Sequence, residues 1–161
     1  MKTLDSTNPL TPFARLIGGE WYYDGKDGAY THHHFEWGVG QKTVISRSYA
    51  PDNNGEVLVS EGFWFWHPAE QTIKGYHIAI GMPVEVFEYT TTFEGNKMVS
   101  ELRATNPEGA VANHIETWQF TDEDHYVCTV DNKTPAGPQK WLELSFIRKS
   151  ENVERGQVNS R

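Results

Sequence analysis

Apolar and polar residues alternate along most of this chain, in short runs separated by turn-forming residues. Alternation with a period of two is typical of β-strands that bury one face. The pattern predicts ten strands, over residues 20–24, 30–39, 42–50, 56–66, 72–80, 84–93, 98–105, 111–120, 125–132 and 140–149. The linkers contain turn sequences such as Asp27-Gly28 and Gly81-Met82-Pro83, and none is long enough for a crossover helix. Consecutive strands are therefore expected to pair antiparallel.

A meander of ten strands removes its two exposed edges by closing into a barrel. The sequence thus predicts an all-β fold, a single antiparallel up-and-down meander β-barrel with a short N-terminal helix. That helix is expected between Pro9 and Gly18, with Thr11 as its cap and Pro12 at its first position. The expected organisation is an N-terminal arm and short helix over residues 1–18, the β-barrel over 19–149 and a flexible tail over 150–161.

Each tight turn fixes the register of the next strand, so one common face can be followed around the barrel. Unpaired charge is costly to bury, and the face that lacks it is expected to point inward. The residues predicted to point inward include Ser46, Ser48, Ser60, Gly62, Trp64, Gly75, His77, Phe87, Tyr89, Val111, Asn113, Ile115, Tyr126, Cys128 and Arg148. Those predicted to point outward include Arg47, Glu61, Glu88, Glu101, Arg103, His114 and Glu116.

The predicted outer face also carries apolar side chains, more than a lone monomer needs. They are Ile45, Val57, Val59, Phe63, Phe65, Tyr76 and Trp118. This surface favours self-association, and a homodimer is a possible assembly.

His77 is the main candidate for chemistry, because it is predicted among small side chains that large rings surround. A cavity with a few convergent polar groups is the usual form of a ligand site. A neutral imidazole there could bond to a ligand or act as a general base, and it could equally be an inert core histidine. The candidate ligand-binding residues are His33, Phe35, Ser46, Ser48, Ser60, Trp64, His77, Phe87, Tyr89 and Asn113, with His77 also the candidate catalytic residue.

Other polar groups are interpreted as structural. The run His32-His33-His34 cannot bind one metal, because neighbours on a strand point to opposite faces. A surface zinc clip from its first and third histidines lacks a fourth ligand, and a solvated polar edge is favoured. The pairs Glu88–Arg103 and Glu101–His114 are predicted to face each other as an outer charge ladder, or as an acid/base constellation if the faces are inverted. Cys128 is interpreted as a small buried hydrophobe.

The two ends of the predicted barrel resemble those of a known family. Gly19-Glu20-Trp21 follows the short helix directly, and Arg148 points inward near the end of the last strand. With the stretches 16–21 and 142–148, these residues resemble lipocalin-like (calycin) barrels, nearest the nitrobindin-like and uncharacterised bacterial lipocalin-like group. The resemblance implies that Trp21 packs beneath the Arg148 guanidinium and closes the barrel.

The resemblance also raises the question of haem. Nitrobindins bind haem through a histidine on the closing strand, but residues 139–149 contain none. The family ligand is therefore not carried over, and His77 or His33 would have to replace it.

Four functions remain open at this point, the last of them a structural barrel that acts through its outer aromatic surface. The first is a barrel that binds a small, mostly apolar or aromatic molecule. The second is a calycin-type enzyme (an isomerase, cyclase or lyase) that uses His77 as acid/base, and the third is a haem barrel with a displaced axial histidine. Binding is favoured, because no inward Asp completes a triad and no Gly-rich phosphate loop precedes a helix.

Composition narrows the partners and the location. The net charge is −8 and no Lys/Arg cluster stands out, which disfavours nucleic acid and anionic membranes as partners. The single cysteine allows no internal disulfide, and no signal peptide is visible at the N-terminus. A cytoplasmic location is expected.

Overall fold

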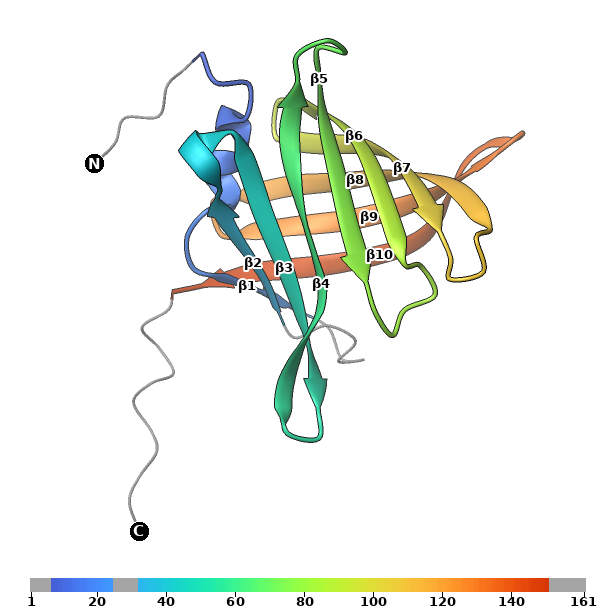
Figure 1. Ribbon diagram of the computed structural model, residues 1–161, viewed down its shortest axis with the longest axis horizontal. Helices are drawn as coiled ribbons and strands as arrows, with labels where there is room; N and C mark the ends of the chain where they lie inside the picture. Colours follow the sequence, from blue (N-terminus) through green and yellow to red (C-terminus); the bar gives the residue numbers. More distant parts are fainter. Residues whose placement is uncertain (1–6, 25–31, 151–161) are drawn as a thin grey trace.

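The computed structural model describes residues 7–24 and 32–150, and in this part of the chain ten β-strands form one closed sheet (Figure 1). The strands are β1 (Glu20–Tyr23), β2 (His32–Trp37), β3 (Thr43–Asp52), β4 (Gly55–His67), β5 (Thr72–Ala79), β6 (Val86–Glu94), β7 (Lys97–Thr105), β8 (Val111–Asp122), β9 (His125–Thr134) and β10 (Gly137–Lys149). Each pairs antiparallel with its neighbours in the chain, and β1 pairs with β10. The predicted all-β up-and-down barrel is confirmed, and such a barrel is consistent with a calycin-like fold.

The strand limits differ from the predicted ones mainly at the hairpins. A five-residue turn was expected between β3 and β4, but Asp52 pairs with Gly55 and only two residues form the turn. The Asp52 carboxylate accepts the backbone N–H of Asn54 at 2.8 Å, which stabilises this tight reversal. The predicted turn Asp27-Gly28, the start of the second strand and the tail after residue 150 lie outside the described residues.

The N-terminal helix is a 3₁₀ helix, η1 (Thr11–Leu16), and it lies against one end of the barrel (Figure 1). A second short 3₁₀ segment, η2 (Val39–Gln41), precedes β3. The expectation that Thr11 caps η1 is wrong, because Leu10 holds the N-cap position and makes no side-chain cap. Leu10, Phe13 and Leu16 are almost fully buried and form part of the hydrophobic core. They make the floor of the barrel.

Arg148 on β10 closes this floor. Its guanidinium lies 4.5 Å from the centre of the Trp21 ring, a cation–π distance. The same group donates hydrogen bonds to the carbonyl oxygens of Arg15 and Ile17 at 2.6 and 3.1 Å. Trp21 Nε1 donates to the Leu16 carbonyl at 3.0 Å. The contact implied by the family resemblance is therefore present, and it joins the last strand to the first strand and to η1.

Strand β8 departs from the predicted faces. His114, Glu116 and Trp118 are buried inside the barrel, whereas Val111 and Asn113 are exposed, so the predicted orientation of this strand is wrong. The predicted inward position of Ile115 is wrong for the same reason, since inward and outward residues alternate.

The cause is the length of the loop before β8. The prediction centred a four-residue turn on 106–109, but Thr105 pairs with Val111 and five residues form the loop. The Asn106 side chain accepts the backbone N–H groups of Glu108 and Ala110 at 3.1 and 2.8 Å and holds this longer loop together. One extra residue shifts the register by one and reverses the faces of the strand.

The corrected register decides which of the expected charge pairs form. Glu88 and Arg103 are opposite each other and their side chains meet at 2.6 Å on the outer face. Glu101 lies opposite Ile115 instead of His114, so the second expected pair is wrong. An acid/base site from these outer pairs is not present.

Candidate functional site

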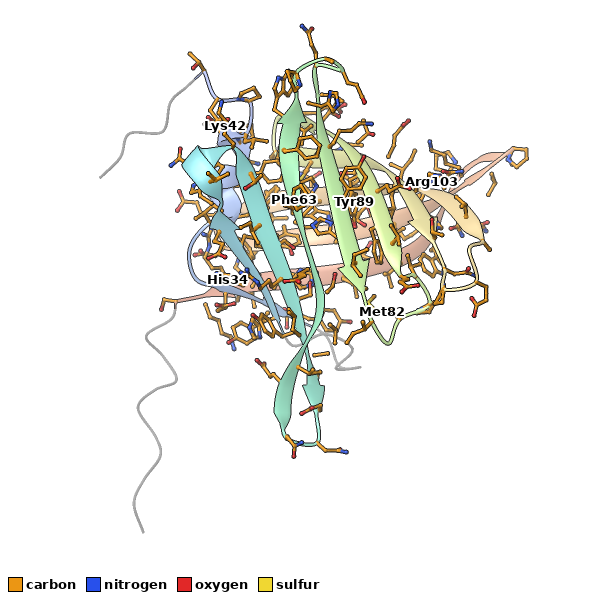
Figure 2. The ribbon with its side chains drawn as sticks, viewed as in Figure 1. His34, Lys42, Phe63, Met82, Tyr89 and Arg103 are labelled. Carbon is orange, nitrogen blue, oxygen red and sulfur yellow. The ribbon has the colours of Figure 1, made fainter. Side chains whose placement is uncertain are left out.

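An internal cavity of about 230 Å³ lies in the barrel beyond the packed floor. Inward-facing side chains of β2 to β10 line it, and the β5–β6 loop and the β9–β10 hairpin contribute at the far end. Figure 2 shows Met82 in that loop and Tyr89 on β6. The lining residues include His33, Ser46, Ser48, Ser60, Trp64, His77, Met82, Phe87, Tyr89, His114, Glu116, Trp118, Tyr126, Cys128, Trp141 and Phe146. A barrel interior with so many buried rings fits a ligand-binding barrel.

Most of the predicted ligand-binding residues line this cavity. The exceptions are Phe35 and Asn113. Phe35 is buried beneath the cavity, where its ring lies 5.9 Å from that of Trp118. Asn113 is exposed on the outer surface because β8 is reversed, so its predicted inward position is wrong.

Two glycines leave space for the rings of Trp64 and His77 in the cavity wall. Gly62 pairs with His77 and Gly75 pairs with Trp64 on neighbouring strands. A Cβ atom on Gly75 would lie 2.5 Å from Trp64 Cδ1, and one on Gly62 would lie 2.1 Å from His77 Cδ2. Each ring therefore lies across the glycine of the opposite strand, and the two ring centres are 4.4 Å apart. The alternating Gly-x-Trp and Gly-x-His pattern builds this wall.

Two of the three cavity histidines, His33 and His77, are neutral. Burial lowers the pKa of His77 from 6.5 to about 3, and the nearby His33 adds to this effect. Burial likewise lowers the pKa of His33 to about 4. Because an uncharged imidazole has one N–H donor and one acceptor, each ring can bond to a polar group of a ligand in either sense. Neither ring supplies positive charge to the cavity.

Glu116 is the acidic group of the cavity, and sequence reasoning missed it. Glu116 is only 8 % exposed to solvent. The indole Nε1 of Trp118 donates a hydrogen bond to Glu116 Oε1 at 2.6 Å, and the Tyr89 hydroxyl bonds to the same carboxyl. Burial raises the pKa of Glu116 from 4.5 to about 7, against the effect of these two donors. The carboxyl is thus poised between its protonated and ionised forms near neutral pH.

The sequence contained one signal that could have found Glu116. Trp118 was predicted to point outward, although a large ring is most often buried. Glu116 and Trp118 are two residues apart and share a face, so placing the ring inside also places the carboxyl inside. Trp141 was missed for another reason, because it lies at a register shift between Lys140 and Leu142. Its ring stacks on His114 at the rim of the cavity, with ring centres 5.5 Å apart.

Several cavity residues carry a buried polar atom that makes no hydrogen bond within the described residues. These atoms are Trp64 Nε1, His77 Nε2, His114 Nδ1 and the Tyr126 hydroxyl oxygen. A buried polar group without a partner costs about 1–3 kcal/mol. All four residues line the cavity, but these four atoms are covered by neighbouring side chains and do not face its open space.

The remaining polar candidates are structural. Burial raises the pKa of the Cys128 thiol well above its usual value, and the nearby Glu116 carboxyl acts in the same direction. Cys128 is therefore an unreactive thiol at neutral pH. His34 Nδ1 lies 2.8 Å from Glu20 and His32 Nδ1 lies 3.1 Å from Glu56 on the outer face. Over residues 7–24 and 32–150, no group of three or more His, Cys, Asp or Glu side chains is arranged to hold a metal ion.

Comparisons with protein-family models and with curated proteins gave no match. Among the described residues, no helix is long and apolar enough to cross a membrane. The fold and the chemistry of the cavity are therefore the features that bear on function.

Proposed function

We propose that this protein binds a small, mostly apolar or aromatic molecule inside a lipocalin-like barrel. The observation that carries the proposal is the cavity of about 230 Å³, whose wall combines large rings with a few polar side chains such as those of Ser46, Ser48 and Glu116. The rings supply apolar contact area and the polar atoms fix the orientation of the ligand. The Trp21–Arg148 closure supports placement near the nitrobindin-like group.

An enzyme that uses His77 as acid/base is a second candidate. Both His77 and Glu116 lie on the wall of the cavity. With its pKa lowered to about 3, His77 is a weak proton acceptor at neutral pH. Glu116, with a pKa of about 7, matches the requirements of general acid/base catalysis better.

The packing around His77 argues against this residue as an axial ligand of haem. His77 Nε2 is covered, and the rings of Trp64 and Tyr89 lie 4.4 and 5.3 Å from the imidazole centre. An iron atom could reach this nitrogen only after those rings moved. A Soret band in haem-soaked protein, lost in His77→Ala, would contradict this conclusion.

Native mass spectrometry of freshly purified protein is the direct test. We expect a bound mass above that of the 18.4 kDa chain, released on unfolding. A neutral fluorescent aromatic probe, N-phenyl-1-naphthylamine, should bind with enhanced emission and should compete with the co-purified molecule. Turnover of that molecule by the protein would select the enzyme hypothesis.

A pair of matched variants locates the binding. Ser60→Phe introduces a ring into the cavity wall and should abolish probe binding. Glu101→Phe introduces the same ring on the outer face, where the side chain is 73 % exposed, and should leave binding intact. Unchanged binding in both folded variants would refute the proposal, because the probe would then bind elsewhere.

A further inference from the structure

We infer that the cavity accepts an organic amine: an apolar or aromatic body that carries one ammonium group, held by Glu116 and the surrounding rings. This inference rests on the proposed function, because it names the chemical class of the ligand for the same cavity. The observations that carry it are the position of one carboxyl group in the cavity wall, the rings around it and the lack of any Lys or Arg among the described lining residues.

The surroundings of Glu116 suit a carboxylate that a cation of the ligand neutralises. Strand β8 points its side chain inward, opposite Ser100 on β7 and Val130 on β9. Trp118 Nε1 fixes one carboxylate oxygen at 2.6 Å, and the Tyr89 hydroxyl is the second donor. Hydrogen bonds to a carboxylate favour its ionised form, so both donors prepare the group to carry charge.

The basic side chains of the described cavity wall are the imidazoles of His33, His77 and His114. The cavity lining contains no Lys or Arg within the described residues. The titratable groups that share the cavity with Glu116 are His114 on the same strand, Tyr126 and Cys128 on β9, Tyr89 on β6, His77 on β5 and His33 on β2. Burial keeps His33, His77, Tyr126 and Cys128 uncharged near neutral pH. A buried carboxylate is stable only when it is paired, so the missing cation is expected to come from the ligand.

The rings next to Glu116 suit an ammonium group. Trp118 and Tyr126 stack with their ring centres 5.0 Å apart, and Trp64 lies 6.0 Å from Trp118 and 5.9 Å from Tyr89. An ammonium over the face of such rings gains a cation–π attraction that is strongest when water is excluded. The net charge of −8 also attracts cations to the protein and repels anions. A carboxylate ligand would meet Glu116 without any positive partner.

The inference predicts a coupling between amine binding and proton release. Burial raises the pKa of Glu116 to about 7, so at pH 6 about nine-tenths of the free protein is protonated at this site. An ammonium ion binds the ionised form, and the displaced proton leaves to the solvent. Amine affinity should therefore rise roughly tenfold per pH unit below pH 7 and level off above it. A neutral ligand of the same shape should show no such rise.

The test compares three small probes with the same phenyl group. They are 2-phenylethylamine, 2-phenylethanol and 3-phenylpropionate, followed by tryptophan fluorescence and by calorimetry. We expect the amine to bind at least tenfold more tightly than the alcohol at pH 8, and the carboxylate to bind most weakly. At pH 6, calorimetry in two buffers of different ionisation enthalpy should show about 0.9 proton released per amine bound.

Glu116→Gln keeps the shape of the side chain and removes the charge. In this variant the amine should lose at least tenfold in affinity while the affinity for 2-phenylethanol changes less than twofold. Glu101→Gln, an outer-face control, should behave like the wild type. If Glu116→Gln does not fold, the proton release measured on the wild-type protein decides the matter.

The outcomes separate this inference from the proposed function. Equal affinity for the amine and the alcohol, or tighter binding of the carboxylate, would overturn the amine inference but leave the cavity as a ligand site. Amine binding without proton release at pH 6 would overturn the role of Glu116. Failure of all three probes to bind would also overturn the inference, and the mass measurement on purified protein would then judge the proposed function separately.

Discussion

The substitution Gly75→Ala tests how the cavity wall is packed. Trp64, which is 2 % exposed, lies across this glycine from the neighbouring strand. A Cβ atom at position 75 would lie 2.5 Å from Trp64 Cδ1 and 2.7 Å from Nε1. Ordinary contacts between such atoms are about 3.5–4.0 Å, so the indole would have to move by about 1 Å. Gly75 is not among the glycines with positive φ, so the backbone itself can accept alanine.

The expected cost follows from two opposed effects. Overpacking a well-packed interior costs about 1–3 kcal/mol. Replacing a glycine by alanine within a strand returns about 0.5–1 kcal/mol, because the unfolded chain loses conformational freedom. We therefore expect Gly75→Ala to lower the free energy of unfolding by about 1–2 kcal/mol.

Urea unfolding followed by tryptophan fluorescence measures this cost, and a double-mutant cycle assigns it. In a Trp64→Leu background the clashing ring is gone, so Gly75→Ala should be neutral or slightly stabilising. The near-ultraviolet circular dichroism of Gly75→Ala should also change, because the Trp64 ring moves. An equal loss of stability in both backgrounds would show that the ring does not lie across this glycine, and the described cavity wall would be incorrect.

Three further predictions follow from the closure, the buried histidines and the outer face. Arg148→Lys should lower the free energy of unfolding by about 2–4 kcal/mol, because an ammonium cannot contact the Trp21 ring and bond to several carbonyls at the same time. Urea unfolding measures this loss, with Lys149→Arg as the control variant. The pKa values of His33 and His77 are lowered to about 4 and 3 in the folded protein. The free energy of unfolding is therefore highest above pH 6.5 and falls at lower pH, because the two histidines bind protons first in the unfolded state. His77→Gln should reduce that dependence by about 1.4 kcal/mol per pH unit between pH 6.5 and 4, and an unchanged slope would contradict the lowered pKa. The 42 % exposed Phe63 is expected to lie in a homodimer interface, so light scattering should give twice the chain mass for wild type and the monomer mass for Phe63→Lys.

The fold was predictable because the strand pattern repeats and each short turn limits its neighbours. The sequence indicated ten strands, the closing role of Trp21 and Arg148, and an interior that includes His77 and Trp64. The strands and the interior depend on alternation, which is visible in sequence wherever two strands meet at a tight turn, whereas the Trp21–Arg148 contact was implied by the family resemblance. The hairpin between β4 and β5 illustrates this, since Gly62 faces His77 as the centred turn requires.

The site was less predictable because its most informative residue lies on the one reversed strand. Glu116 appeared to be an ordinary outward charge, since charged residues are seldom buried. Its burial depends on tertiary context, namely the donors Trp118 and Tyr89 and the enclosing rings. A rule that assigns charge to the outside therefore fails at Glu116, which this barrel keeps inside.

The reversal was also hidden by a second irregularity. The five-residue loop shifts the register before β8, and a bulge between Phe120 and Asp122 shifts it back before β9. The two shifts cancel, so the predicted inward residues of β9, such as Cys128, are correct although β8 is inverted. Agreement on later strands therefore could not reveal the error. The size of Trp118 could have revealed the error, because a large ring is most often buried. Two residues that are two positions apart on a strand share a face, and in this barrel the face of Trp118 and Glu116 is the wall of the cavity.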